Sequence, residues 1–381
     1  MKMSTLPNRL VVSAPPQGWR LRWVAWRNSV IASPSFQHWA ARLPIFRSIA
    51  QRRAGQSFDL VAGFCYSQVL TACVQLGLLD LLAQRAHDLA SLAGATGLSE
   101  DAALRLIRAA CALSLAEQVA SGLWMLGQQG AALQANPGAI AMVRHHALLY
   151  SDLADPAALL RRDRAEPTAL SSFWRYAAST PGPEAARYSA LMAASQAMVA
   201  QQVLAAYRFD RHARLLDVGG GHGAFAIGVA KACPELGIGV FDLPPVVAGT
   251  AGVLAEAGLS EKVRLHPGDF FCDSLPVGYD CITLVRILHD HDDDAALALL
   301  RSVHAALPPG GRLVIAEPMA DAPGAAAMGD AYFGLYLWAM NSGRPRSFGE
   351  YGALLKSAGF SASRSQRTAY PVVSSLIVSS K

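Results

Sequence analysis

The stretch Arg214-Leu-Leu-Asp-Val-Gly-Gly-Gly-His-Gly-Ala-Phe225 decides the fold. Residues 213–218 form an apolar run that predicts a buried parallel strand, and residues 224–232 have the amphipathic spacing of a helix. The glycines between them have no Cβ, so the backbone can turn tightly and a ligand can lie against it. The stretch therefore predicts the first half of a strand–helix–strand unit, with a nucleoside site at the turn.

A carboxylate separates two kinds of cofactor that such a turn can hold. The glycines alone also fit the dinucleotide fingerprint. Asp217 lies just before the turn, where it would repel a pyrophosphate but attract the sulfonium and amino acid portion of S-adenosylmethionine. The sequence therefore favours the methyl donor over NAD.

Two later strands are expected to end in groups that suit a nucleoside. Residues 237–242 predict the second strand, whose terminal Asp242 is placed to bond ribose hydroxyls. Residues 263–266 predict a third strand, after which Asp269 and Phe270 could hold the adenine amine and ring face. A loop cap is the alternative explanation for Asp269 alone.

The fourth and fifth predicted strands lead to the residues expected to do the chemistry. The fourth, residues 279–285, is followed by His289, and ligands of open α/β sheets bind outside the carboxyl ends of the strands. A neutral imidazole near pH 7 suits removal of a proton from an attacking oxygen. Glu317 ends the fifth strand, residues 312–317, and could fix the tautomer of His289. A strand-end salt bridge is the alternative role for Glu317.

The acids that follow His289 could also indicate a magnesium site. Asp292, Asp293 and Asp294 directly precede an apolar helical run. A helix N-terminal cap with a favourable dipole interaction explains them better than a metal ion does. We therefore expect no metal at the site.

Length and composition indicate two domains with a large core, because the chain has 381 residues and 52% of them are hydrophobic. We expect an N-terminal arm over residues 1–57, a helical domain over 58–164, a helical bridge over 165–212 and the donor-binding domain over 213–381. Six single cysteines without a CxxC pair predict buried, reduced thiols and a cytoplasmic protein. Without a run of about 20 uncharged apolar residues or a signal pattern, neither a membrane span nor standard export is expected.

The net charge of +5 conceals an asymmetry. Residues 1–58 carry nine basic residues and no acid, so the rest of the chain is net negative. Four of the seven tryptophans lie among these arginines: Trp19, Trp23, Trp26 and Trp39. Such a mixture suits an anionic membrane surface. Nucleic acid is a second candidate partner, and packing of the tryptophans on the protein body or on a dimer mate is the third.

A helix-turn-helix is predicted by residues 88–97 and 99–108, with a short hairpin over 118–126. Its second helix offers only Arg105 and Arg108 to bases or phosphates, which is little for reading DNA. A scaffold or dimerisation use of this shape is therefore favoured over DNA binding.

Together these stretches resemble the large family of S-adenosylmethionine-dependent small-molecule O-methyltransferases, which includes plant caffeate and flavonoid enzymes. The resemblance covers residues 58–381 and rests on Leu216-Asp-Val-Gly-Gly-Gly-His-Gly223, Phe241-Asp-Leu-Pro244, Gly268-Asp-Phe270, Leu288-His-Asp290, Ala316-Glu317 and Ala358-Gly-Phe360. It implies an α/β fold with a Rossmann-like class I methyltransferase domain, an N-terminal all-α, winged-helix-like dimerisation domain, and a homodimer.

The resemblance also implies roles for single residues. His289 would be the base, Asp290 would help to hold the acceptor, and Glu317 would orient His289. The residues expected to bind the donor are Asp217, Gly219, Gly221, Asp242, Leu243, Asp269, Phe270 and Arg286. Six residues are expected at the substrate pocket, although core packing is the default for the first four: Phe173, Trp174, Met192, Met198, Trp338 and Asn341.

Two positions depart from the family's pattern. Many relatives have a second glutamate beside the histidine, just before an Arg-Thr pair, where this chain has Pro345 in Arg344-Pro-Arg-Ser347. The orientation of His289 would then rest on Glu317 alone. His291 replaces the usual tryptophan after the His-Asp pair, which affects how the pocket packs.

Within the family, the arm, the start of the helical domain and the tail look most like bacterial enzymes that methylate the tertiary hydroxyl of acyclic carotenoids, of the hydroxyneurosporene or demethylspheroidene type. Such a substrate is dissolved in membrane, and a positive, aromatic arm would place the pocket at the inner face of the cytoplasmic membrane. A phenolic or polyketide hydroxyl is the first alternative acceptor. A helix-turn-helix regulator with an inactive methyltransferase fold is the second alternative.

Overall fold

The computed structural model describes residues 18–173, 196–324, 327–371 and 373–381. The chain forms two compact units, Met1–Leu70 and Thr71–Lys381. The larger unit contains all the residues predicted to bind the donor or to act in catalysis.

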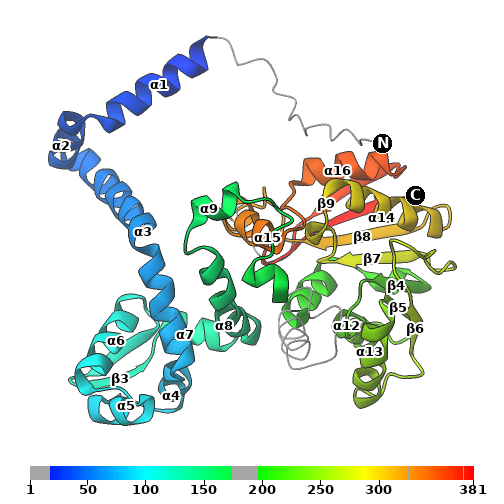
Figure 1. Cartoon of the computed structure of the whole chain (residues 1–381), viewed down its shortest axis with the longest axis horizontal. Coiled ribbons are helices and arrows are strands. Elements are labelled where there is room, and N and C mark those ends of the chain that lie inside the picture. Colours follow the sequence, from blue (N-terminus) through cyan, green and yellow to red (C-terminus); the bar gives the residue numbers. More distant parts are fainter. Residues whose placement is uncertain (1–17, 174–195, 325–326, 372) are drawn as a thin grey trace. The chain divides into compact units, whose positions relative to one another are not determined.

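A seven-stranded sheet organises the C-terminal part of the larger unit (Figure 1). Its strands follow the order β6 (Val263–Pro267), β5 (Gly237–Asp242), β4 (Arg214–Val218), β7 (Cys281–Val285), β8 (Arg312–Glu317), β10 (Ser375–Ser380) and β9 (Ala362–Gln366). The first five strands are parallel, whereas β10 runs antiparallel to β8 and β9. This architecture confirms the predicted α/β fold, and the five predicted strands lie within two residues of their expected bounds.

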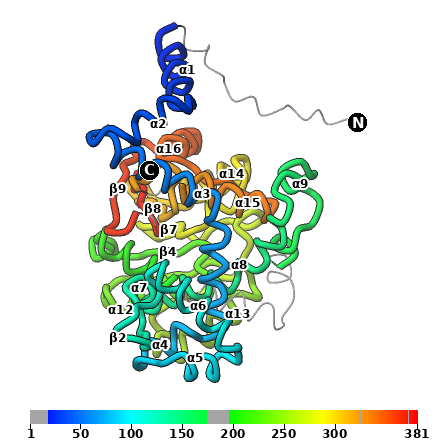
Figure 2. The backbone as a smooth tube through the Cα atoms, turned by 90° about the vertical axis from the view of Figure 1, so that its left-hand side faces the viewer, coloured from blue at the N-terminus to red at the C-terminus, as the bar shows by residue number. Residues whose placement is uncertain are grey.

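Both faces of the sheet are covered, which explains why its central strands are almost continuously apolar. One face packs on α14 (Asp293–Ala306) and α16 (Phe348–Ser357). The other packs on α12 (Ala224–Ala232), on α13 (Pro244–Glu256) and on the helical residues 196–206. Seen from the side, β4, β7 and β8 lie one beside the other between these helical layers (Figure 2).

The strand order reverses between β4 and β7, and open α/β sheets bind their ligands at the carboxyl ends of such neighbours. β4 ends in the glycine-rich turn. β7 leads into η2 (Leu288–Asp290), a single 3-10 turn that carries His289. The fold thus brings the donor turn and the candidate base to the same edge of the sheet.

The N-terminal part of the larger unit contains the predicted helix-turn-helix and hairpin. Its elements are α4 (Leu78–Gln84), β1 (His87–Asp88), α5 (Leu89–Thr96), α6 (Glu100–Ala112), β2 (Ala116–Ala120), β3 (Leu123–Leu126) and α7 (Gln128–Gln134). Gly97 ends α5 in the left-handed conformation, and the Ser99 hydroxyl caps α6 by accepting from the Ala102 amide at 3.3 Å. The strands form a small sheet in the order β1-β3-β2, so helices dominate this part without being its whole content.

Three more helical segments precede β4 along the chain. They are α8 (Pro137–Asp152), α9 (Pro156–Arg161) and η1 (Phe209–Arg211). Late in the chain, the π-helix η3 (Ala327–Phe333) runs into α15 (Gly334–Met340). π-helical turns are rare and are frequently found at functional sites.

The described part of the smaller unit consists of helices joined by single residues. It holds α1 (Trp19–Ala32), α2 (Pro34–Arg42) and most of α3 (Pro44–Gln75). Although the sequence predicted no membrane span, one helix among the described residues, α3, is long and apolar enough to cross a membrane by length and composition alone. The four tryptophans of the arm are all exposed, from 49% at Trp23 to 78% at Trp19.

The cysteines are only partly as predicted. All six are free. Cys73 and Cys281 are buried, but Cys65 and Cys272 are exposed, so the expectation that every thiol is buried was wrong. Cys65 lies on α3 and Cys272 in the loop after β6, where no described element covers them.

Candidate active site

The glycine-rich turn has the backbone that only glycine adopts freely. Gly219, Gly221 and Gly223 have φ angles of 71°, 56° and 78°. A Cβ on Gly219 would overlap the Ile287 side chain, and a Cβ on Gly220 would lie 2.7 Å from an oxygen of Asp217. A side chain at Gly219 or Gly220 would therefore occupy space that neighbouring side chains already take up, and the turn accepts glycine best at these positions.

Asp217 presents an unsatisfied oxygen beneath this turn. The side chain is 1% exposed, and its Oδ1 accepts a 2.8 Å hydrogen bond from Thr283, its register partner on β7. Oδ2 is buried without a hydrogen-bond partner among the described residues. Burial raises the pKa of Asp217 to about 7. A buried, unpaired acceptor of this kind fits a cationic donor molecule, as the sequence predicted for S-adenosylmethionine.

Asp242 at the end of β5 fastens the turn to the second strand. Its carboxylate accepts the amide of Gly221 at 2.8 Å and the amide of Leu243 at 2.7 Å. Burial nevertheless raises the pKa of Asp242 above its ordinary value. The structure thus brings Asp217, Gly221, Asp242 and Leu243 together at one edge, as predicted.

Asp269 and Phe270 follow β6, also at this edge. An oxygen of Asp269 accepts the Phe271 amide at 2.9 Å, which is the loop cap considered as the alternative from sequence. The Phe270 ring meets the His291 ring nearly edge-on, with centroids 5.7 Å apart. Both side chains are only partly buried, so a nucleoside contact remains a prediction.

Arg286 adopts an unusual backbone conformation directly after β7. Its φ angle is 58°, which is costly for a residue with a Cβ. Its amide donates to the Ala316 carbonyl at 2.8 Å, which holds this bend against β8. The bend redirects the chain into η2 and so places His289 over the sheet edge.

His289 lies between two carboxylates. Its Nδ1 contacts Glu317 Oε2, and its Nε2 lies 3.1 Å from Asp290 Oδ1. Both ring nitrogens can face carboxylates only as donors, so this arrangement describes the imidazolium form. To act as a base, His289 must lose the proton on Nε2, and the Asp290 carboxylate must turn away from that nitrogen.

Glu317 holds both the ring and the turn that carries it. The side chain is fully buried at the end of β8. While one oxygen contacts His289, the other accepts the amides of Ile287 at 2.9 Å and Leu288 at 2.7 Å. The geometry predicted for these two residues is present, and it is firmer than a strand-end salt bridge alone.

The net effect of these neighbours is to raise the pKa of His289. Burial lowers it, but the carboxylates of Asp290 and Glu317 outweigh burial, and Arg286 opposes them. His289 therefore gains its free base form at a higher pH than an ordinary histidine does.

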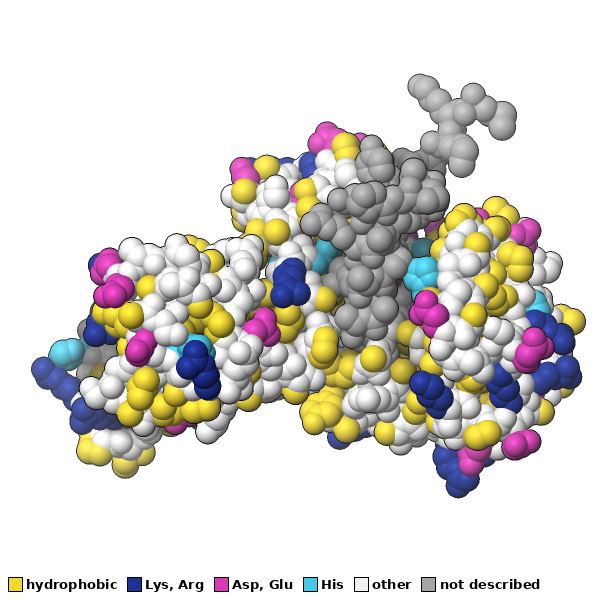
Figure 3. Space-filling view, turned by 90° about the horizontal axis from the view of Figure 1, so that it is seen from below, with side chains coloured by type: hydrophobic (Ala, Val, Ile, Leu, Met, Phe, Trp, Pro, Cys, Tyr) yellow, Lys and Arg dark blue, Asp and Glu magenta, His cyan; other side chains and the backbone are white. Residues whose placement is uncertain are grey.

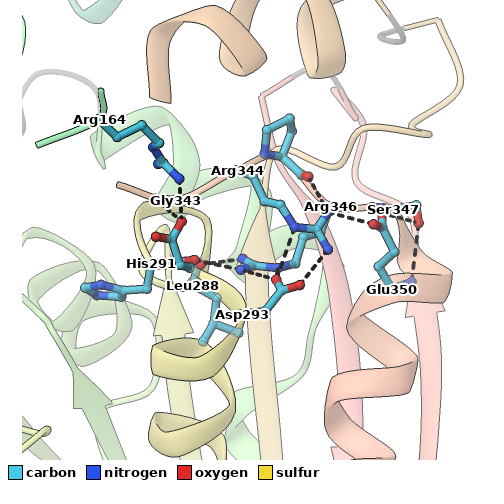
Figure 4. Close-up of polar contacts among 11 residues, drawn as sticks. Arg164, Leu288, His291, Asp293, Gly343, Arg344, Arg346, Ser347 and Glu350 are labelled. Carbon is cyan, nitrogen blue, oxygen red and sulfur yellow. Dashed lines mark hydrogen bonds and ion pairs between the residues drawn. The ribbon is translucent and has the colours of Figure 1, made fainter. Parts of the chain in front are cut away.

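The three aspartates after η2 begin α14 as predicted, with Asp292 at the N-cap position and the next two in the first turn, but the expected capping hydrogen bond is absent. The Asp292 side chain instead accepts the Gly343 amide at 3.1 Å. Asp293 pairs with Arg344 and Arg346 (Figure 4). Over the described residues, no group of three or more His, Cys, Asp or Glu side chains is arranged to hold a metal ion.

The residues expected at the substrate pocket are only partly gathered. The Phe173 ring lies 5.0 Å from that of His145, and Met198 faces Asn136. Trp338 donates to the Leu159 carbonyl at 2.9 Å, and Asn341 binds Arg162, so their polar groups connect α15 to the segment around α9. Trp174 and Met192 lie outside the described residues.

An aromatic wall that sequence reasoning missed lies beside the candidate base. It consists of His145 and His146 on α8, Tyr332 and Phe333 on η3, and Tyr336 on α15. Phe333 meets His289 edge-on at 6.0 Å, His146 Nε2 lies 2.7 Å from the Tyr332 hydroxyl, and His145 Nε2 lies 2.9 Å from the Tyr336 hydroxyl. The spacing of three aromatic residues over one helical turn was the available sequence signal.

This aromatic wall is uncharged at neutral pH. Burial lowers the pKa of His145 to about 4 and also lowers that of His146. Burial raises the pKa of the Tyr332 phenol. The side chains beyond His289 therefore offer apolar rings with paired, neutral polar groups.

Comparison with known proteins agrees with this geometry. Residues 150–361 match the O-methyltransferase domain, and residues 58–132 match the O-methyltransferase dimerisation domain. The chain belongs to the O-methyltransferase family. Its methyl donor is S-adenosylmethionine. The buried Oδ2 of Asp217, which has no hydrogen-bond partner among the described residues, and the glycine-rich turn both fit this donor.

Two curated relatives and one solved structure are especially informative. The chain is 45% identical to the demethylspheroidene O-methyltransferase of Rhodobacter capsulatus, over 88% of this chain and 84% of that one. It is 43% identical to the enzyme of the same name from Cereibacter sphaeroides, over 86% and 87%. The structure of PigF with S-adenosylhomocysteine matches at a TM-score of 0.70 and 25% identity, covering 86% of this chain and 99% of that one.

Proposed function

We propose that this O-methyltransferase methylates the tertiary hydroxyl of an acyclic carotenoid of the hydroxyneurosporene or demethylspheroidene type. The observation that carries the proposal is the uncharged aromatic wall beside His289, because a polyene offers almost only apolar surface to its pocket. The names of the relatives from Rhodobacter capsulatus and Cereibacter sphaeroides support the same acceptor.

In this proposal His289 accepts the hydroxyl proton while the oxygen attacks. A tertiary alcohol is too weak an acid for a neutral imidazole to ionise beforehand, so proton removal accompanies methyl transfer. Glu317 stabilises the imidazolium that forms, and Asp290 leaves Nε2 to bond the acceptor. S-adenosylmethionine supplies the electrophilic methyl group. The remaining task of the chain is alignment of the acceptor with that group.

We assign donor binding to the turn and to the strand ends around it. Asp217 would face the cationic portion, Asp242 the ribose hydroxyls, and Asp269 with Phe270 the adenine. The backbone of Gly219, Gly221 and Leu243 and the bend at Arg286 would shape the site. We assign Phe173, Met198, Trp338 and Asn341 to the rim of the acceptor pocket.

Incubation with labelled methyl donor and a panel of acceptors tests the function. The panel contains acyclic carotenoids with and without a tertiary hydroxyl, together with phenols and a polyketide hydroxyl. The proposal expects label only in the hydroxylated carotenoids. Transfer to phenols or polyketides alone would contradict it.

We also propose that the enzyme works as a homodimer. Within the dimerisation domain, the middle of α3 leaves a row of large apolar side chains uncovered: Phe58, Leu60, Val61 and Phe64. Leu60 is 88% exposed. Covering this surface with a second copy would bury apolar area that a monomer leaves in water.

The arm is proposed to dock on an anionic membrane surface at the cytoplasmic side. Residues 18–57 contain seven arginines and no acid, and the exposed tryptophans lie between them. Elsewhere, on the face that Figure 3 shows, basic and acidic side chains are interspersed over the described surface. Residues 18–57 therefore carry a net positive charge that no acidic side chain within them offsets.

Duplex DNA is not favoured as a partner. On the second helix of the helix-turn-helix, Arg105 is paired with Asp101 at 3.0 Å. Arg108 alone is too little to anchor a recognition helix on phosphates.

A further inference from the structure

The carbonyl groups of four consecutive residues, 288–291, accept hydrogen bonds from one short segment, residues 342–346. These four residues comprise η2 and the residue after it. Arg346 donates to Leu288 O at 2.7 Å and to His291 O at 2.6 Å. Between these two, the Arg344 amide donates to His289 O at 3.0 Å, and the Ser342 hydroxyl donates to Asp290 O at 2.5 Å. The backbone on both sides of His289 is therefore fixed from outside the turn.

Arg346 is built into the protein at an energetic cost that needs a reason. Its side chain is 0% exposed, and a buried guanidinium is unfavourable unless its donors and its charge are matched. Its Nε donates to Asp293 at 2.9 Å, and its cation lies 5.8 Å from the centre of the Tyr351 ring. Burial raises the pKa of Asp293, but hydrogen bonds from Arg344 and Arg346 lower it overall, so the counter-charge is ionised.

The geometry of the guanidinium matches this task. A planar fork can donate in two directions at once, whereas an ammonium is a compact point charge on a flexible stem. Figure 4 shows Arg346 between Leu288, His291 and Asp293. One side chain thus connects both ends of η2 to the start of α14.

Gly343 allows the segment to come this close. Its φ angle is 80°, and a Cβ there would overlap His289 O and lie 2.6 Å from the carbonyl carbon of Asp290. Close approach of two backbones, and not chain flexibility, is therefore what this glycine provides.

We propose that residues 342–346 form a clamp that positions His289, with Arg346 as its central positioning residue. Glu317 contacts the ring and accepts the amides of the two residues that precede His289, whereas the clamp donates to the carbonyl groups of residues 288–291. Arg346 touches neither reactant; it acts by holding the His289 ring against Glu317. The proposal rests on the proposed role of His289 as the base.

The readout is the titration of His289 itself, which needs no acceptor. The charged and titratable groups that influence it are Asp290 on η2, Glu317 on β8, Arg286 after β7 and the neighbouring His291. If the clamp is loosened, the ring leaves the two carboxylates that stabilise its cation. The pKa of His289 should then fall towards its ordinary value.

The test compares the full-length protein with Arg346→Lys in NMR titrations of 13C-labelled histidine, with His289 assigned from the spectrum of His289→Gln. We expect the His289 titration to move to lower pH in Arg346→Lys, and turnover to fall about 10-fold or more with KM for the donor unchanged. Arg301→Lys is the matched control, because it makes the same exchange at an exposed arginine of α14 that lies outside the clamp. It should titrate and turn over like the wild type.

Ser342→Ala keeps the proposal testable if Arg346→Lys does not fold, since it removes one hydroxyl from a partly buried site. It should shift the His289 titration in the same direction by a smaller amount. A folded Arg346→Lys or Ser342→Ala protein with the wild-type titration would overturn the clamp, as would an equal loss of turnover in Arg301→Lys. Wild-type turnover of His289→Gln would instead overturn the proposed function, whatever the titrations show.

Discussion

Asp217 is the residue at which stability and donor binding oppose each other. Its folded pKa of about 7 is above its ordinary value of 3.8, so the folded protein without donor binds a proton that the unfolded chain releases. The stabilising effect of that proton is complete only below the unfolded pKa of 3.8 and is lost as the pH rises through about 7. The ionised carboxylate, in contrast, is the form that attracts a cationic donor.

Replacing Asp217 by Asn should therefore make the donor-free protein more stable at pH 8 while weakening its affinity for S-adenosylmethionine. Thermal unfolding without ligand and calorimetric titration with the donor measure the two effects. Wild-type affinity should increase as the pH rises through about 7, and the variant should lack that increase. An Asp217→Asn protein with lower Tm at pH 8 and wild-type affinity would show that Asp217 is a structural residue.

Glu317 sets the pH at which His289 becomes a base. Its negative charge favours the imidazolium, so Glu317→Gln should lower the pKa of His289 and move the rising limb of kcat/KM to lower pH. Turnover should fall on the order of 10²-fold, because the developing imidazolium loses its charged partner. A pH profile at saturating donor checks both effects. If the rising limb of kcat/KM stays at the wild-type pH, Glu317 does not set the pKa of His289.

At the scale of elements, patterns within one strand or helix were readable from the sequence. β5, β8 and α12 lie at their predicted bounds, because strands buried on both faces are apolar and end at turns or acids. The sequence did not predict the aromatic wall, nor the contacts that residues 342–346 make with η2. η3 meets α8, and residues 342–346 meet η2, only through tertiary contacts between distant parts of the chain. The hydrophobic periodicity of a single helix or strand carries no information about such contacts.

The roles of the helix-cap aspartates illustrate the same limit. Position alone predicted that residues 292–294 would cap α14, and they do begin that helix. The partners of Asp293 are two arginines some 50 residues later, and one of them is fully buried. A charge that is buried in the folded protein cannot be distinguished in sequence from one at the surface.

α3 provides an element-scale prediction. Leu60→Glu would place a charge on the exposed apolar surface of the dimerisation domain, and the homodimer should dissociate in light-scattering chromatography. Leu160→Glu is the matched control, since Leu160 is an exposed leucine of α9 outside that domain. A Leu60→Glu protein that stays dimeric, or a Leu160→Glu protein that dissociates, would show that this surface is not the interface.

At the scale of the whole molecule, the question is how a soluble donor and a membrane-dissolved acceptor reach one site. The arm offers a physical answer, because basic residues near an anionic surface contribute about 1 kcal/mol each and are screened by salt. Deletion of residues 1–43 removes α1 and α2 and leaves α3 whole.

The truncated protein should bind donor normally, but it should no longer sediment with phosphatidylglycerol vesicles in about 0.1 M salt. Its turnover should fall more for carotenoid in membranes than for carotenoid in detergent. Phosphatidylcholine vesicles are the control for charge. Undiminished sedimentation would exclude residues 1–43 as the anchor, and loss of the dimer would show that the tryptophans of this segment pack between protomers.

The most direct test of the account is single-turnover methyl transfer to an acyclic carotenoid with a tertiary hydroxyl, with wild-type protein and His289→Gln compared in the same detergent. Both proteins should bind S-adenosylmethionine equally well. The wild type should label the tertiary oxygen, and the variant should do so on the order of 10²-fold more slowly, which is the usual contribution of a positioned base. Equal rates for the two proteins, or no label on the tertiary oxygen by the wild type, would contradict the account.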